Sequence, residues 1–359
     1  MQTREFGQTA QGEPVHLLEV GRAPGVVLRL LTLGATVHGL ELTGGDGIRR
    51  DVALAHPDVA AYEESGDYLG GTIGRYANRI ALGLVELEGR TVRLGTHDRG
   101  HHLHGGPHGF DTRVWQVLDG PTLGHPDADP APGAERVTLG LESPDGDQGY
   151  PGRMWAEVTF EAAPDGLAVW FAAVADAPTL ANLTSHLYLN LEGAGSGTVD
   201  DHVLTVPAAR YTPVDSTGIP LGEHEPVEGT PFDLRGGARI GDVVRSGAPQ
   251  VVAARGLDHN LVPEGAGWRE VARLASPRTR TAVVLSSDQP GLQVYTGNFL
   301  DGASPARGGG THRQGDGVAL EPQLHPDTPH RAPGPDWPSA VLLPGRTYRA
   351  ALAWRVVVD

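Results

Sequence analysis

Histidine is the side chain best suited to proton transfer near neutral pH, and four histidines stand in one short stretch of this sequence. They are His101, His102, His104 and His108. His102 and His104 would share one face of a strand, an arrangement in which two imidazoles can reach one metal ion. The alternative is that one of the four is functional and the others are polar loop residues. Because no Glu stands nearby at a metal-ligand spacing, we expect no metal site and retain a metal-dependent β-fold enzyme as an alternative.

A further histidine, His186, lies in residues 179–191, where apolar and polar residues alternate. One face of the predicted strand would carry Leu183, Ser185, Leu187 and Leu189. The opposite face would carry neutral hydrogen-bonding side chains, namely Asn182, Thr184, His186, Tyr188 and Asn190. A solvated strand face more often carries Lys, Glu or Arg. The pattern therefore favours the floor of a polar cleft over an ordinary solvent-facing strand.

Glu321 follows the apolar residues 317–320 and precedes Pro322, which has no backbone donor. We expect this carboxyl to lie at the end of an apolar strand and to be partly buried, which would raise its pKa. The alternative is an ordinary surface Glu. Two further polar clusters, residues 75–79 and 258–260, lie among glycines. Each of these signals indicates a site only in combination with the others.

The composition removes several classes of chemistry. The chain has no Cys, which excludes thiol nucleophiles, iron–sulfur clusters, disulfides and Cys-ligated zinc. It has no Lys either, so all 28 basic residues are Arg, which excludes Schiff-base catalysis and the phosphate-loop lysine. The remaining His, carboxylate, Arg, Asn and Gln residues suit a site that hydrogen-bonds a polyhydroxylated ligand and moves protons.

The charge balance and the apolar pattern limit the partners. The 28 basic and 44 acidic residues give a net charge of −16 at pH 7. Because phosphate binding needs a basic face, nucleic acid is not expected as a partner. The N-terminal residues lack the apolar core of a signal peptide, and no apolar run approaches the ~18 residues of a transmembrane helix. We therefore expect a cytoplasmic protein with no membrane partner.

Two-residue alternation dominates the chain and predicts antiparallel strands with one solvated face. The predicted strands are 26–33, 91–94, 136–141, 155–160, 167–173, 179–190, 203–206, 282–286, 292–296 and 348–358. Helical signal is scarce, and the short helix predicted is 58–65, with Asp58 as its N-cap and Tyr62 facing inward. Residues 119–134 and 302–317 are expected to be loops. With 51 glycines and 29 prolines available for turns, residues 1–359 are predicted to form a single all-β domain, a large antiparallel β-sandwich with few short helices.

Seven short motifs resemble, in the same order, those of the aldose 1-epimerases, which are also called galactose mutarotases. They are GRYANRI at 74–80, LHGG at 103–106, DGDQGYPG at 145–152, NLTSHLYLNL at 182–191, DHN at 258–260, QVYTGNFL at 293–300 and LEPQ at 320–323. Each motif is modest, but the ordered set is highly specific and spans most of the chain. The resemblance implies the β-sandwich of the galactose mutarotase type and an isomerase that needs no cofactor and no metal.

The resemblance also implies roles for particular residues. His186 would be the general acid and Glu321 the general base. The residues implied to line the sugar site are Asn78, Arg79, His104, Asp258 and Gln293. The substrate would be a small aldose such as galactose or glucose, and the protein would be a monomer or a homodimer.

These groups suit the implied reaction because an aldopyranose is a hemiacetal. Changing its anomer requires the C1–O5 bond to break, the aldehyde to turn and the ring to close on the other face. A proton must reach O5 while another leaves the C1 hydroxyl, so one acid and one base on opposite sides of the ring would serve, each worth ~10²–10⁴-fold. No C–H bond breaks and no electrons leave the sugar, so no nicotinamide cofactor is needed.

Two alternatives share the expected fold. One is a carbohydrate-binding or regulatory protein that has lost activity, against which the presence of both His186 and Glu321 argues. The other is a sugar-phosphate mutarotase, against which the lack of an Arg cluster beside the motifs weighs.

Overall fold

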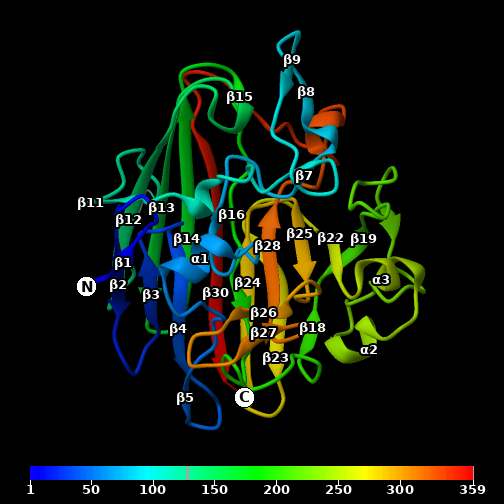
Figure 1. The fold of residues 1–359 in the computed structure, drawn as a ribbon. Coiled ribbons are helices and arrows are strands. Elements are labelled where there is room, and N and C mark those ends of the chain that lie inside the picture. Colours follow the sequence, from blue (N-terminus) through cyan, green and yellow to red (C-terminus); the bar gives the residue numbers. More distant parts are fainter. Residues whose placement is uncertain (127–128, 359) are drawn as a thin grey trace.

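A computed structural model describes residues 1–126 and 129–358, and its largest sheet has nine antiparallel strands (Figure 1). Their order across the sheet is β11-β12-β13-β14-β30-β24-β23-β18-β21. The strands are β11 (Gln116–Leu118), β12 (Glu135–Ser143), β13 (Met154–Ala163), β14 (Gly166–Ala175), β18 (Val203–Thr205), β21 (Ala238–Arg239), β23 (Arg269–Ser276), β24 (Thr281–Ser287) and β30 (Tyr348–Val358). The longest alternating segments of the sequence thus form the centre of this sheet, and β30 has its predicted bounds.

Strand β30 illustrates why alternation produces this sheet. Its residues Leu352 and Trp354 are buried and lie opposite Val169 and Leu167 of β14. Arg355, one position on, points to the other face and is exposed. Burying each large apolar side chain contributes roughly 1.5–3 kcal/mol, so a one-residue slip in register would lose several such contributions at once.

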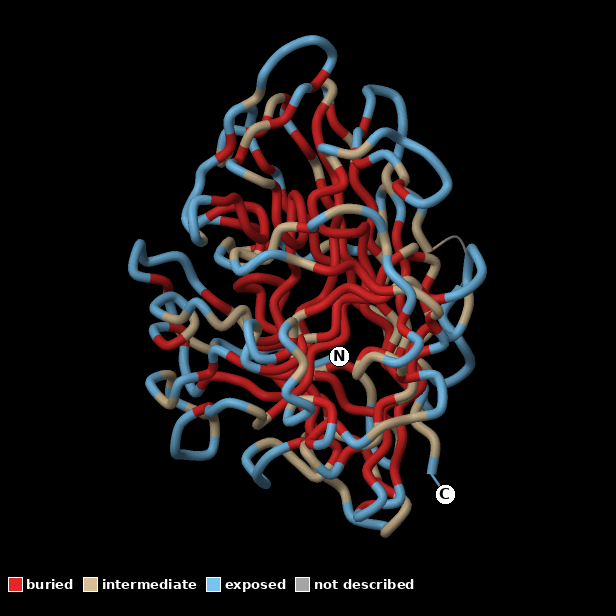
Figure 2. Tube along the Cα trace, turned by 90° about the vertical axis from the view of Figure 1, so that its right-hand side faces the viewer, coloured by how far each residue is buried: buried red, intermediate tan, exposed pale blue. Residues whose placement is uncertain are grey.

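Two smaller sheets share the interior with the large one. The five-stranded sheet contains β1 (Gln2–Gln8), β2 (Pro14–Gly21), β3 (Val27–Leu31), β4 (Thr36–Thr43) and β5 (Arg49–Asp51). The six-stranded sheet contains, in spatial order, β17 (Tyr188–Leu189), β28 (Val318–Gln323), β25 (Gly291–Tyr295), β22 (Asp258–Pro263), β19 (Ala208–Tyr211) and β20 (Glu225–Pro226). One cluster of buried apolar residues runs from Leu18 to Trp354 and takes side chains from all three sheets. Figure 2 shows these buried segments in the interior and the exposed loops around them.

The remaining strands form short two-stranded pairs that tie loops to the sheets. They are β6 (Thr72–Ile73) with β16 (Thr184–Ser185), β7 (Arg79–Ile80) with β10 (His102–Leu103), β8 (Leu84–Leu87) with β9 (Arg90–Arg93), β15 (Thr179–Leu180) with β29 (Val341–Leu342), and β26 (Asp301–Pro305) with β27 (Thr311–Arg313). The pairs β6–β16 and β7–β10 hold the loops that carry several of the predicted site residues.

The all-β prediction is confirmed, and the described residues contain three α-helices of five or six residues. Helix α1 (Val59–Glu64) was predicted, and the Asp58 carboxylate accepts a hydrogen bond of 3.0 Å from Ala61 N as its N-cap. Helices α2 (Ile240–Val244) and α3 (Pro249–Ala254) were not predicted. No helix in the described ranges is both long enough and apolar enough to cross a membrane.

Strands β2, β4 and β23 lie outside every predicted strand, and two predicted segments are altered. Residues 302–317 are not simply a loop, because β26 and β27 pair there as a hairpin. Gly308, Gly309 and Gly310 all have positive φ, which lets the chain reverse between these two strands. Residues 179–190 form three two-residue strands rather than one. The loop predicted over 119–134 holds in its described residues, and residues 127 and 128 lie outside them.

Candidate active site

Three neighbouring strands of the six-stranded sheet place polar side chains in one row. Glu321 of β28 lies opposite Gln293 of β25, which lies opposite Asn260 of β22. Residues directly opposite each other share a face, and Asp258, two residues before Asn260, shares it too. Gln293 Nε2 donates a hydrogen bond of 2.7 Å to Asp258 Oδ1. The carboxylates from residues 258 and 321 therefore meet over the same patch of sheet.

The sequence had suggested that Glu321 lies at the end of a strand. The structure instead places it inside β28. It is 1% exposed, with Gln323 continuing β28 beyond it. The carbonyl of Pro322 accepts a hydrogen bond of 2.8 Å from Thr184 Oγ1. On this side of β28, β17 pairs only with Val318 and Ala319, so a proline is tolerated at position 322. The missing N–H of Pro322 therefore breaks no strand pairing on that side.

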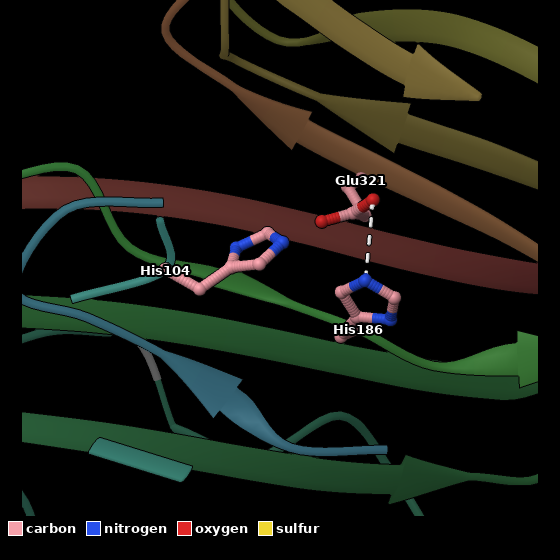
Figure 3. Close-up of side chains that lie close together, drawn as sticks. All are labelled: His104, His186 and Glu321. Atoms are coloured by element: carbon pink, nitrogen blue, oxygen red, sulfur yellow. Dashed lines mark ion pairs between the residues drawn. The ribbon is translucent and has the colours of Figure 1, made fainter. Parts of the chain in front are cut away.

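The backbone of His186 bridges two short strands beside β28. Its N–H donates to Gly71 O at 2.9 Å, and its carbonyl accepts from Gly70 N at 3.0 Å. The His186 ring is thereby brought to Glu321, with 3.7 Å between Nε2 and Oε1 (Figure 3). The two groups are 135 positions apart in the sequence, so only the fold makes them neighbours.

The segment that carries His186 is buried on both of its sides, so the alternative of an ordinary solvent-facing strand is wrong. His186 and Tyr188 face a cavity, as the predicted cleft requires. The other polar residues of that face bond to backbone carbonyls: Asn182 Nδ2 to Ala77 O, Thr184 Oγ1 to Pro322 O, and Asn190 Nδ2 to Gly197 O and Asp316 O. They hold neighbouring loops in place and do not line the cavity.

His104 completes the cluster from the opposite wall, and its ring points toward His186 and Glu321 (Figure 3). Asn78 N donates to His104 Nδ1 at 3.2 Å, and His104 N donates to Asn78 O at 3.1 Å. A ring nitrogen that accepts a hydrogen bond carries no hydrogen, which assigns the hydrogen to Nε2. His104 therefore offers an N–H donor to the cavity.

Arg79 is held by a carboxylate beside this wall. Its Nε lies 2.8 Å from Asp98 Oδ2, and Arg99 lies 3.4 Å from the other oxygen of Asp98. Asn78 Oδ1 accepts from the backbone N–H of Arg79 at 2.8 Å, which fixes the Asn78 amide against the first residue of β7. Arg79 therefore presents a partly neutralised cation at the cavity.

All seven predicted site residues line one cavity of about 360 Å³. They are Asn78, Arg79, His104, His186, Asp258, Gln293 and Glu321. That volume suits a small ligand. A larger cavity of about 770 Å³ lies elsewhere and contains none of the seven, so we place the candidate site by its convergent polar groups and not by size.

Sequence reasoning missed several residues that line the same cavity. They are Asp67, Tyr68, Asp98, Tyr295 and Phe299 among others. Tyr295 stood inside a quoted motif, and its position two residues from Gln293 could have identified it. Asp67 and Tyr68 follow a short helix in a loop, where no periodic pattern points to them. His259 of the DHN motif turns away and packs on Phe232 at 4.5 Å between ring centroids.

Burial shifts the proton affinities of the central pair in opposite directions. Burial, reinforced by the negative charge of Asp258, raises the pKa of the Glu321 carboxyl well above its ordinary value. Burial lowers the pKa of His186 to about 4. The hydrogen bonding agrees, because Glu321 Oε2 and His186 Nδ1 are buried without a partner in the described residues. Burial thus favours the neutral form of both side chains, a protonated carboxyl at Glu321 and an uncharged ring at His186.

His104, His186 and Glu321 also offer ligand atoms within 4.8 Å of one another, which raises the question of a metal ion. A metal-bound imidazole carries its hydrogen on the other nitrogen and donates it to an acceptor. The other nitrogen of His104 instead faces the Asn78 N–H donor. The donor set therefore lacks the supporting hydrogen bonds of a resident metal.

The four clustered histidines of the sequence also fail to form a metal site. His102 Nδ1 lies 2.7 Å from Gly95 O, and its Nε2 lies 2.6 Å from the Tyr150 hydroxyl. His101 Nδ1 accepts from Leu82 N at 2.9 Å. Both nitrogens of His102 are thus occupied by protein groups. Of the four, His104 alone lines the cavity, which agrees with the alternative that one is functional.

The turn after His104 depends on Gly105, and a substitution there is expected to unfold the wall of the cavity. Gly105 has φ 88, and an added Cβ would lie 1.8 Å from Gly74 O. We expect Gly105→Ala to lower the free energy of unfolding by about 3 kcal/mol or more, measured by denaturant titration. Gly100→Ala is the matched control, because Gly100 has φ 84 but no atom within 4 Å of the added Cβ. It should cost about 1 kcal/mol, and equal losses in the two variants would contradict the steric argument.

Comparison with known proteins gives matches along nearly the whole chain. The family model described as Aldose 1-epimerase matches residues 16–355, a range that contains all seven site residues. The chain is 33% identical to aldose 1-epimerase of Escherichia coli K12 over 353 residues, covering 97% of each chain. It is 35% identical to galactose mutarotase of Homo sapiens over 322 residues, covering 89% of this chain and 87% of that one.

The fold comparison agrees with the sequence comparison. The solved structure of galactose 1-epimerase from Lactobacillus acidophilus NCFM superposes with a TM-score of 0.84 at 28% identity, covering 100% of this chain and 98% of that one. A GalM/aldose epimerase homologue from C. elegans gives the same TM-score at 26% identity, covering 95% and 98%. The matches extend over the sheets and over the loops that form the cavity.

Proposed function

The chain belongs to the aldose 1-epimerase family, and we propose that its cavity interconverts the α and β anomers of hexopyranoses such as galactose and glucose. Proteins of this family are isomerases that act on sugars, and this protein is one of them. The observation that carries the proposal is the buried imidazole–carboxylate pair, His186 and Glu321, in a cavity of about 360 Å³. The continuous apolar core supports treating residues 1–359 as one domain that builds this site.

The pair acts from neighbouring positions, which differs from the expectation of an acid and a base on opposite sides of the ring. The 3.7 Å between His186 Nε2 and Glu321 Oε1 leaves no room for a pyranose between them. O1 and O5 are both bonded to C1, so two groups side by side can each reach one of these oxygens. Glu321 then takes the proton of the C1 hydroxyl while His186 protonates O5.

Sugar binding prepares the pair for this exchange. Burial favours the neutral carboxyl of Glu321 and the neutral ring of His186, whereas ring opening needs a carboxylate and an imidazolium. A bound sugar supplies a hydrogen-bond partner to each ion, because its O1–H donates to the carboxylate and its O5 accepts from the imidazolium. The proton therefore moves from Glu321 to His186 as the sugar binds. Closure of the ring reverses both transfers.

The other predicted residues hold the sugar around this pair. His104 donates through Nε2–H, and Arg79 stabilises negative charge that develops on the oxygens of the opening ring. Gln293 Oε1 is buried without a partner in the described residues, so it is available to a sugar hydroxyl. Asp258 accepts from hydroxyls further round the ring and is itself oriented by Gln293.

A sugar-phosphate substrate is less well supported. The arginines at the cavity, Arg79 and Arg99, both contact Asp98, which offsets their charge. A phosphate would need unpaired cations that point at one position. The neutral aldose therefore fits the charge of the cavity better.

Polarimetry tests the proposed function directly. Freshly dissolved α-glucose and α-galactose should reach their equilibrium rotation faster with the protein than without it. A protein that binds these sugars without accelerating mutarotation would be the non-catalytic alternative. Addition of a chelator should leave the rate unchanged, and loss of activity with chelator would support a metal enzyme instead.

The pH dependence of kcat/KM should report the one-proton state of the pair. As pH falls through the lowered pKa of His186, about 4, the pair gains a second proton and His186 can no longer take the proton from Glu321. As pH rises through the raised pKa of Glu321, the pair loses its only proton. We therefore expect kcat/KM to reach a plateau above about pH 5 and to fall again at the raised pKa of Glu321, measured by polarimetry with the spontaneous rate subtracted. An acidic limb between pH 6 and 7, as an exposed histidine would give, would contradict this state.

A further inference from the structure

We propose that Tyr68, a residue outside every recognised motif, is a substrate-contacting residue of this cavity whose hydroxyl donates to the sugar and whose ring fixes the two imidazoles. The proposal rests on the proposed function, because it assigns a further contact within the same sugar site. Three independent observations carry it: the state of the hydroxyl, the contacts of the ring and the conformation of the backbone.

The hydroxyl of Tyr68 differs from those of the other tyrosines that line the cavity. Tyr188 Oη donates to Asp67 O at 3.2 Å, and Tyr295 Oη accepts from Phe299 N at 2.9 Å. Tyr68 Oη has no hydrogen-bond partner within residues 1–126 and 129–358, and its side chain is half-buried against the cavity. Burial raises the pKa of its phenol, so the group stays a donor. A donor on the wall of a polar cavity is available to a ligand oxygen.

The ring of Tyr68 contacts both imidazoles of the site. Its centroid lies 4.7 Å from that of His104 and 5.8 Å from that of His186. The two imidazole rings are themselves 5.3 Å apart and nearly perpendicular. The three rings therefore pack as one group, and the Tyr68 ring limits rotation of the two histidine side chains about their χ angles.

The backbone holds Tyr68 in a conformation that a bulky residue rarely adopts. Its φ is 57, in the left-handed region. Hydrogen bonds from Gly71 N to Tyr68 O and from Gly70 N to His186 O tie this loop to the segment that carries His186. Strain of this kind persists where the surroundings enforce it, and here the enforcing contacts come from the site itself. Glycine or Asn would fit the backbone better, which points to a use for the aromatic side chain.

Two variants separate the roles of the hydroxyl and the ring. Tyr68→Phe keeps the ring and removes the donor, so KM for galactose or glucose should rise about tenfold with kcat within twofold of the unsubstituted enzyme. Tyr68→Asn suits the left-handed backbone but removes the ring. We expect its melting temperature to be equal or higher, with kcat lowered at least about tenfold because the imidazoles lose their packing.

Tyr211→Phe is the matched control, since Tyr211 stacks on Phe232 outside the cavity. It should leave KM and kcat unchanged. Unaltered KM in Tyr68→Phe would overturn the hydroxyl contact, and unaltered kcat in folded Tyr68→Asn would overturn the role of the ring. If the unsubstituted protein accelerates no aldose, the proposed function fails; calorimetric titration with galactose then tests Tyr68, because Tyr68→Phe should still bind about tenfold more weakly.

Discussion

Replacing Glu321 by Gln is expected to lower the mutarotation rate by at least ~10²-fold while the protein stays folded. The amide has the shape of the carboxyl but cannot take the proton of the C1 hydroxyl. Glu321 Oε2 is buried without a hydrogen-bond partner in the described residues and Oε1 lies 3.7 Å from His186 Nε2, so the substitution breaks no side-chain hydrogen bond. Burial raises the pKa of the carboxyl and so favours its neutral form, which the amide resembles. The melting temperature should therefore be unchanged or higher, as is common where a catalytic group is held at a cost to stability.

The control for this variant is a buried glutamate outside the cavity. Glu157 is fully buried, and its carboxylate accepts from Thr122 N and from Trp155 Nε1. Glu157→Gln should lower the melting temperature, because an amide nitrogen cannot accept these bonds, and should leave kcat unchanged. The two variants therefore have opposite effects on stability and activity. A near-normal rate in Glu321→Gln would mean that another group is the base.

The long strands could be predicted because their alternation reflects burial on a single face. Strand β30 matches its predicted bounds, and β14 and β24 extend theirs by one or two residues at each end. In the segment 179–190, alternation did not predict the strand bounds. Both of its faces are buried, so alternation no longer separates inside from outside. The segment is divided into three short strands because they pair with three different strands, β6, β28 and β29, which are distant in sequence.

The site was predictable to the extent that it consists of polar residues in ordered motifs. His186 and Glu321 could be singled out from local pattern, while Asp258 and Gln293 came from the resemblance, and all four line one cavity. The 3.7 Å contact between imidazole and carboxylate could not be predicted, because it depends on β17 packing beside β28. Tyr68 was not predicted because it lies in a loop, at a positive φ, where no periodic pattern of residues marks it.

Replacing His186 by Asn should remove the proton donor to O5 and lower the mutarotation rate by at least ~10²-fold. Asn is a smaller polar residue, and His186 Nδ1 has no partner in the described part of the chain, so the hydrogen bonds of the fold survive. Circular dichroism and the melting temperature should confirm folding. His202→Asn is a control with a buried histidine outside the cavity, and it should affect stability without lowering kcat. A rate within tenfold of normal in His186→Asn would show that O5 receives its proton from elsewhere.

The double variant makes the stronger test, because the mechanism treats His186 and Glu321 as one unit with a shared proton. If either member is missing, the remaining one cannot complete the exchange with the hemiacetal. The combined variant His186→Asn with Glu321→Gln should therefore lose about as much activity as either single variant and not the product of the two losses. Multiplying losses in the polarimetric rates would mean that the two residues act in separate steps. Such a result would require a different proton path across the 3.7 Å that separates them.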